Sequence, residues 1–195
     1  MIFKIKTDKP IIFLTIDDGP CDISTPNTLN ILDKYGIKAT FFCIGEKILK
    51  NKELSLKIKT EGHYIANHSF LHINGWKTKL NDYLLNVKLG ENITNSKIFR
   101  PPYGKLSPLQ YLHLKKTNKI VLWSLMVYDF DNSRNIEKEK KLIENKLKPG
   151  AIIVFHDNEN AVRKKDLLLP YLIELALEKN YTFHTLDQLN NFLTI

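Results

Sequence analysis

Short apolar runs alternate with longer amphipathic stretches along most of the chain. Apolar runs bounded by turn residues are typical of buried strands, whereas apolar residues three and four apart indicate helices. The pattern predicts strands over 11–14, 38–44, 64–66, 98–99, 119–124, 151–155 and 181–184, and helices over 25–35, 46–60, 79–92, 108–116, 136–147 and 167–179. This alternation favours an α/β fold with parallel strands and outer helices, either a barrel or an open doubly wound sheet.

The length and composition fit one domain spanning residues 1–195. With 195 residues, 43% of them apolar, the chain can bury one sizeable core and is too short to presume two. The N-terminus lacks a signal-peptide core, and no apolar run approaches the roughly 20 residues that span a bilayer. We therefore expect a soluble protein without a transmembrane segment, cytoplasmic by default and exported if a leader was removed.

Charge and cysteine content narrow the possible partners. The formal net charge is +8, but the excess is almost all lysine and is scattered through the predicted helices. A nucleic-acid-binding protein usually gathers its basic residues in one patch, so we expect no nucleic-acid partner. The only cysteines are Cys21, after a turn, and Cys43, in an apolar run, which imply no disulfide framework.

Two polar clusters indicate chemistry. Asp17 and Asp18 follow the first strand side by side, and such a pair is stable when a cation binds or a proton is shared, although an isolated Asp-Asp-Gly is more often a turn. His68 and His72 are four residues apart, which would place both rings on one face of a helical turn. Two histidines and one carboxylate with an open position form the catalytic zinc pattern.

Five ordered motifs resemble the polysaccharide deacetylases of the NodB-homology type, carbohydrate esterase family 4. The motifs are Thr15-Ile16-Asp17-Asp18-Gly19, His68 to His72, Arg100-Pro101-Pro102-Tyr103-Gly104, Asp129 in Val127-Tyr128-Asp129-Phe130, and Ile153-Val154-Phe155-His156. The resemblance spans nearly the whole chain. It implies a distorted, incomplete (β/α) barrel of about seven strands, with the site at the carboxyl ends of the strands.

The resemblance also implies a ligand set and a base. Asp18, His68 and His72 match the metal ligands, with Zn²⁺ as the default and Co²⁺, Ni²⁺ or Fe²⁺ as alternatives. Asp17 is left without metal and is the candidate general base. By resemblance, Arg100 pairs with this base and orients it, the alternative being a surface arginine before a turn.

The remaining predicted roles concern the transition state and the leaving group. In the family, the backbone N–H at Tyr103 joins the metal in holding the oxyanion, and the ring could stack on sugar. His156 ends a strand and is the candidate general acid. If the strand persists, Asp157 points to the opposite face, and Asp129, which matches the family's fourth motif, is the better partner for His156.

Some histidines and motif positions fall outside this scheme. We interpret His63, His113 and His184 as structural or exposed. Met126 stands where the family frequently has an Asp, and Phe130 where it usually has a Trp. These two departures from the family pattern affect the wall of the substrate groove, so the family does not indicate which sugar is preferred.

The sequence thus predicts a metal-dependent hydrolase that removes the N-acetyl group from amino sugars of a glycan. An O-acetyl sugar esterase and a catalytically inactive carbohydrate-binding module on the same fold are the alternatives, and nucleic-acid binding ranks third. The particular glycan and the oligomeric state are not predicted.

Overall fold

The computed structural model describes residues 1–192, and residues 193–195 lie outside it. Its strands are β1 (Ile11–Asp17), β2 (Thr40–Cys43), β3 (Tyr64–Asn67), β4 (Ile98–Phe99), β5 (Lys119–Ile120), β6 (Leu125–Met126), β7 (Ile152–His156) and β8 (Thr182–Phe183). Its α-helices are α1 (Thr25–Lys34), α2 (Gly45–Lys50), α3 (Lys52–Thr60), α4 (Leu80–Thr94), α5 (Pro108–Leu114), α6 (Ile136–Lys146) and α7 (Val162–Glu178). Short 3₁₀ turns cover Gly75–Lys77, Pro102–Gly104 and Leu186–Asn191.

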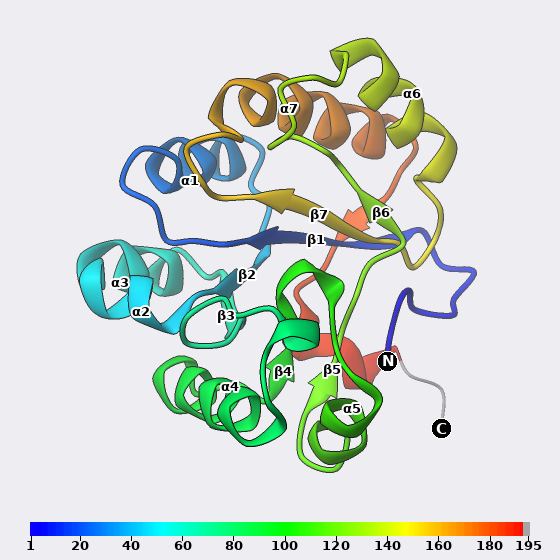
Figure 1. The fold of residues 1–195 in the computed structure, drawn as a ribbon. Coiled ribbons are helices and arrows are strands. Elements are labelled where there is room, and N and C mark those ends of the chain that lie inside the picture. Colours follow the sequence, from blue (N-terminus) through cyan, green and yellow to red (C-terminus); the bar gives the residue numbers. More distant parts are fainter. Residues whose placement is uncertain (193–195) are drawn as a thin grey trace.

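The strands form one curled parallel sheet with the helices outside it (Figure 1). Seven strands follow the order β5-β4-β3-β2-β1-β7-β6, and β8 adds to the amino-terminal part of β1. Single bridges join Ile2 to Val121 and Lys4 to Ala151, so the N-terminal segment helps to close the open side. The expected incomplete (β/α) barrel of about seven strands is confirmed, and the open doubly wound sheet is wrong.

The alternation of β1 determines which side chains reach the inside of the barrel. Ile12, Leu14 and Ile16 pack outward against α1, α3, α6 and α7 in the largest core cluster. Ile11 and Phe13 belong to the inner cluster instead. Because successive side chains of a strand face opposite sides, Asp17 falls on the inner face, at the carboxyl end.

The boundaries of several elements differ from the sequence prediction. The helix predicted over 46–60 is two helices, because Asn51 leaves the helical conformation between them. The strand predicted over 119–124 is regular only at β5, and β6 was not predicted, because it is two residues defined by pairing with β7. Helix α1 begins at Thr25, as predicted, with Ser24 at its N-cap, and ends at Lys34, one residue before the predicted end.

Helix α7 begins at Val162, five residues before the predicted start at Leu167. Its first turn contains lysines that a sequence pattern places in solvent, yet Lys164 and Lys165 are buried. The Lys164 amine donates to the backbone carbonyls of Asp131 and Arg134, and the Lys165 amine pairs with Asp157. Specific partners therefore replace water around these charges, which only tertiary structure reveals.

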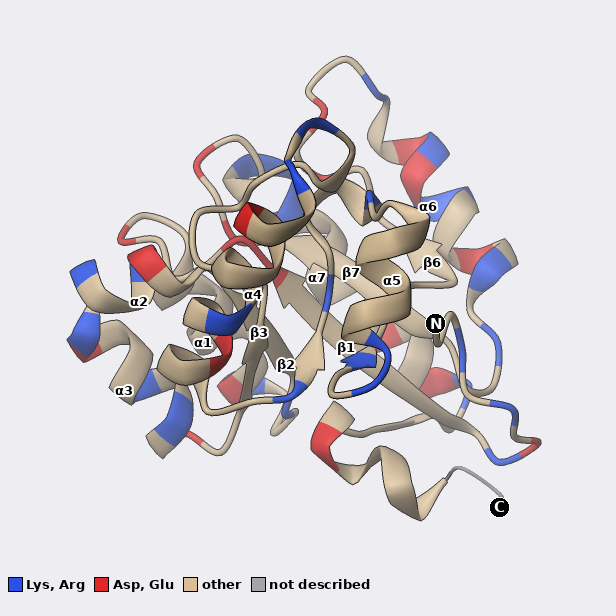
Figure 2. Cartoon of the chain, turned by 60° about the horizontal axis from the view of Figure 1, so that its bottom comes forward, with Lys and Arg blue, Asp and Glu red and all other residues tan. Residues whose placement is uncertain are grey.

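Lys and Arg lie on helices and loops on several sides of the molecule, interspersed with Asp and Glu (Figure 2). No helix within residues 1–192 combines the length and the apolar character needed to cross a bilayer.

Candidate active site and metal centre

Asp17 and His156 end adjacent strands. They are register partners in the pairing of β1 with β7, so both side chains enter the barrel at its carboxyl end. This places the candidate base and the candidate acid in one cleft, which both residues line.

Arg100 is fully buried and holds Asp17 from inside the barrel. Its Nη1 donates to Asp17 Oδ1 at 2.6 Å and to Thr15 Oγ1 at 2.7 Å. Its Nη2 donates to the carbonyl of Leu122 at 2.9 Å, and its guanidinium lies 4.0 Å from the ring centre of Phe42. The alternative of a surface arginine is therefore wrong, and the guanidinium has the partners that a buried charge requires.

Asp18, His68 and His72 form the one group of His, Cys, Asp or Glu side chains within residues 1–192 whose arrangement suits a metal ion. One ligand atom from each lies within 4.8 Å of the others. Asp18 Oδ1 is 3.5 Å from His68 Nε2 and 3.1 Å from His72 Nε2. His68 Nδ1 lies 2.8 Å from the carbonyl oxygen of Arg100. A carbonyl oxygen can only accept a hydrogen bond, so the ring donates from Nδ1. The lone pair on Nε2 of the neutral ring is then available to a metal.

Electrostatics at Asp18 also fit a cation. Burial opposes ionisation of Asp18, but hydrogen bonds with His68 and His72 outweigh it and hold the pKa of this carboxyl well below its ordinary value. Asp18 has a positive φ of 76°, a conformation that costs free energy for a non-glycine residue. One carboxylate oxygen and two imidazole nitrogens are the donor set of catalytic zinc sites, so the residues present fit a divalent ion.

The histidine pair is not on a helical turn, so that prediction is wrong. Residues 68–72 form an irregular loop, with positive φ at Ser69 and His72. Two asparagine side chains accept the hydrogen bonds of backbone N–H groups in this loop. Asn67 Oδ1 accepts from the Ser69 N–H, and Asn86 Oδ1 accepts from the N–H groups of the two residues after Ser69. The loop thus brings the rings together without helical spacing.

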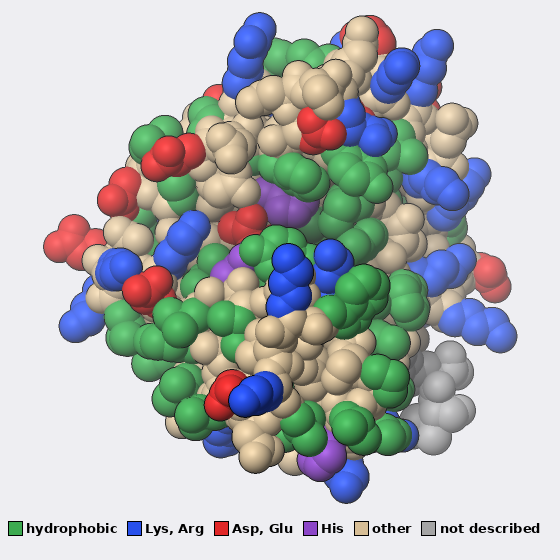
Figure 3. All heavy atoms as spheres, in the orientation of Figure 1, with side chains coloured by type: hydrophobic (Ala, Val, Ile, Leu, Met, Phe, Trp, Pro, Cys, Tyr) green, Lys and Arg blue, Asp and Glu red, His purple; other side chains and the backbone are tan. Residues whose placement is uncertain are grey.

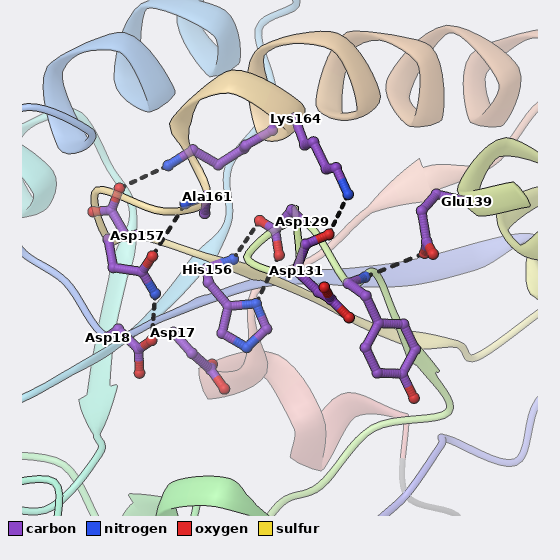
Figure 4. A network of polar contacts seen from close by, with 12 residues as sticks. Asp17, Asp18, Asp129, Asp131, Glu139, His156, Asp157, Ala161 and Lys164 are labelled. Carbon is purple, nitrogen blue, oxygen red and sulfur yellow. Dashed lines mark hydrogen bonds and ion pairs between the residues drawn. The ribbon is translucent and has the colours of Figure 1, made fainter. Parts of the chain in front are cut away.

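His156 and Asp129 are in contact, as expected. Asp129 accepts from the backbone N–H of His156 and from its ring Nδ1, each at 2.8 Å (Figure 4). Burial alone would lower the pKa of His156, but the hydrogen bond to Asp129 and the charge of that carboxylate raise it above its ordinary value. Phe130 packs edge-on against the imidazole, with ring centres 4.6 Å apart.

Tyr103 lies at the mouth of the site. Its φ of 59° is left-handed, and its side chain is 60% exposed, with the ring centre 4.7 Å from that of His72. Within residues 1–192, six non-glycine residues have a positive φ, and four of them are Asp18, Ser69, His72 and Tyr103. Such strained positions concentrate at functional sites.

These groups open into a cleft of about 440 Å³. Figure 3 shows histidine and acidic side chains in a hollow flanked by hydrophobic ones. Its lining includes the apolar side chains of Trp123, Met126 and Phe130, together with Lys105, Asn158 and Asn160. Sequence reasoning missed Trp123, Lys105 and both asparagines. Asn158 follows the fifth motif by two residues, which was a usable signal, whereas no sequence signal places Trp123 or Lys105 in the cleft.

The other histidines and Cys21 lie outside this cleft, whose lining includes none of them. His63 is buried, its Nδ1 accepts from the Ala39 N–H, and burial lowers its pKa to about 4. His113 is exposed and His184 is half-buried.

Comparison with known proteins places the chain in a family of carbohydrate-active enzymes. The chain belongs to the polysaccharide deacetylase family, whose sequence profile matches residues 4–119. A peptidoglycan-N-acetylglucosamine deacetylase of Bacillus cereus is 30% identical over 194 residues, which cover 96% of this chain and 91% of that protein. The chain spans 64% of a second deacetylase of that organism. The family resemblance seen in the motifs is confirmed.

Solved structures agree with the fold. A peptidoglycan N-acetylglucosamine deacetylase in complex with 4-naphthalen-1-yl-N-oxidanyl-benzamide matches with a TM-score of 0.89 and 28% identity, covering 96% of this chain and 91% of that one. A carbohydrate esterase family 4 pseudoenzyme from Bacillus anthracis matches with a TM-score of 0.80 and 23% identity, covering 96% of this chain and 68% of that one. Because a pseudoenzyme has the same fold, activity must be argued from the site residues.

Proposed function

We propose that this protein is a metal-dependent deacetylase that removes the acetyl group from N-acetylated amino sugars of a glycan. One observation carries the proposal: a three-ligand cluster, an arginine-bound aspartate and an aspartate-bound histidine meet in one cleft. Amide hydrolysis needs an activated water, a base to take its proton and an acid for the amine, and this constellation offers a group for each.

Asp18, His68 and His72 would hold the metal. A divalent ion in that position would make a coordinated water acidic and polarise the amide carbonyl, and Zn²⁺ is the first choice for this donor set. Asp17 accepts the proton of the attacking water. Arg100 binds one oxygen of Asp17 and fixes the direction from which the carboxylate acts.

His156 supplies the second proton transfer. When the bond between the acetyl carbon and the sugar nitrogen breaks, the imidazolium donates its proton from Nε2 to the departing amine, and the oxygen of water leaves in acetate. Asp129 accepts from Nδ1, so it fixes the tautomer and favours the charged ring. The backbone N–H of Tyr103 is the candidate donor to the tetrahedral oxyanion.

The substrate that we propose is N-acetylglucosamine in a glycan, with peptidoglycan first. The name of the Bacillus cereus relative supports this choice, and the aromatic rings of Trp123 and Phe130 in the lining of the cleft suit the apolar face of a sugar ring. An O-acetyl sugar ester is the rival substrate. An inactive carbohydrate-binding module is the rival from another class, as the related pseudoenzyme illustrates.

A substrate panel tests this proposal. Zinc-loaded protein is incubated with N-acetylglucosamine oligosaccharides, purified peptidoglycan and an O-acetylated xylo-oligosaccharide, and acetate and free amine are both quantified. We expect equal amounts of acetate and amine from an N-acetylated substrate, and none from the Asp17→Asn variant. Acetate without amine would assign an O-esterase, and binding without acetate from any substrate would assign the binding module.

A further inference from the structure

Asn158 lies on the turn between β7 and α7, outside the five motifs, and contacts the metal cluster. Its Nδ2 lies 2.9 Å from Asp18 Oδ2. Asn158 has no role in the proposed reaction, although its side chain lines the same cleft as Asp18.

The orientation of the Asn158 amide is determined by its other contact. Its Oδ1 accepts the backbone N–H of Ala161 at 3.1 Å. An N–H group can donate only to the oxygen, so the NH₂ group faces Asp18, whose carboxylate can only accept. Both contacts require the same orientation of the amide.

This hydrogen bond divides the two oxygens of Asp18 between two tasks. Oδ2 accepts from Asn158, while Oδ1 faces His68 and His72 at 3.5 and 3.1 Å. The backbone of Asp18 is held as well, because the Lys47 amine donates to its carbonyl at 2.9 Å. The hydrogen bond to Oδ2 therefore holds the carboxylate in the orientation in which Oδ1 faces the two histidines.

The turn that carries Asn158 is itself fixed in place. The Asp157 N–H donates to the carbonyl of Asp17 at 2.7 Å, so the turn is joined to β1 directly. The Asp157 side chain faces away from the cleft, where it binds the Lys165 amine at 2.8 Å and the Thr25 hydroxyl at 2.5 Å. Asp157 and Lys165 are fully buried, so Asn158 projects from a rigid part of the molecule.

We infer that Asn158 is a positioning residue that sets metal affinity by holding Asp18 with Oδ1 toward the two histidines. The inference rests on the metal site of the proposed function. Hydrogen-bond partners of metal ligands typically change metal affinity by about 10–100-fold when they are removed.

The test measures Zn²⁺ affinity by competition with a chromogenic chelator, together with the unfolding temperature of each metal-free protein. The variants are Asn158→Ala and Asn158→Ser. A serine hydroxyl can still accept the Ala161 N–H but is too short to reach Asp18, so it separates the two contacts. Asn160→Ala is the matched control, because Asn160 lies on the same turn and lines the same cleft.

We expect both Asn158 variants to bind Zn²⁺ about 10–100-fold more weakly, and the Asn160 control to bind it like the wild type. The unfolding temperature of metal-free Asn158→Ser should stay close to that of the wild type, which a merely structural role would not predict. If Asn158→Ala does not fold, Asn158→Ser decides. Wild-type affinity in Asn158→Ser, or equal losses in the control, would overturn the inference. A wild-type protein without Zn²⁺ affinity would instead overturn the metal site itself.

Discussion

Gly90 lies in helix α4 directly against the loop that carries His68 and His72. A Cβ atom at this position would lie 2.3 Å from Asn67 Oδ1 and 2.7 Å from the carbonyl carbon of Ser69. Carbon and oxygen atoms approach to about 3.3 Å, so the loop would have to move by about 1 Å. Asn67 Oδ1 is the acceptor that stabilises the loop, through the Ser69 N–H at 2.8 Å.

Gly90→Ala therefore tests whether this close packing shapes the site. Helix propensity alone predicts that Gly90→Ala stabilises the protein by roughly 0.5–1 kcal/mol. Overpacking costs about 1–3 kcal/mol, and a strained hydrogen bond at Asn67 about 1 kcal/mol more. We expect a net loss of about 1–3 kcal/mol, which lowers the Tm of a chain of this size by roughly 2–12 °C.

The assay combines urea unfolding of metal-free protein with turnover of the zinc-loaded enzyme at a temperature where it is folded. Displacement of the loop by about 1 Å should lower turnover by up to about 100-fold. Asn92→Ala, at an exposed position of the same helix, is the control and should change stability by no more than about 0.5 kcal/mol. Higher stability of Gly90→Ala with unchanged turnover would refute the reasoning.

Three further predictions concern the proposed roles. Asp17→Asn should keep its metal and lose most turnover, whereas Asp18→Asn should bind the metal more weakly. If elemental analysis found Asp17→Asn to be the metal-poor variant, Asp17 would be the ligand and Asp18 the base. His156→Ala should lose about 10²–10⁴-fold in rate on amides with metal content unchanged, and less on an activated ester that barely needs protonation. Asp129→Asn removes the carboxylate that raises the pKa of His156, so the alkaline limb of the pH–rate profile should move to lower pH. An unchanged limb would mean that His156 is not the acid.

The alternation of apolar runs and amphipathic stretches was enough to predict parallel strands with outer helices, whereas the incomplete barrel was predicted only from the family resemblance. This was possible because strands such as β1 and β7 are buried along their whole length and are mostly apolar, and helices separate most successive strands. The same pattern could not place β6 or the start of α7. A strand of two residues is defined by its partner, and the first turn of α7 buries lysines whose partners are distant in sequence.

The candidate site was predicted as a set of residues, but not as a geometry. The family motifs identified His68 and His72 as candidate ligands, and their spacing suggested a helical turn. In the structure, hydrogen bonds to the side chains of Asn67 and Asn86 hold them on an irregular loop. Local side-chain bonds to the backbone override spacing in such segments. Asn158 was missed for a related reason, since its amide acts on a residue 140 positions away in the chain.

The central claim is that hydrolysis depends on a metal held by Asp18, His68 and His72. The most direct measurement titrates chelator-treated protein with Zn²⁺ and follows acetate release from an N-acetylglucosamine oligosaccharide. The account predicts no activity without metal, a linear rise that ends at one Zn²⁺ per chain, and no recovery in Asp18→Asn at the same concentrations. Full activity of the metal-free protein would contradict it, as would one bound Zn²⁺ per chain with no acetate released from any N-acetylated glycan.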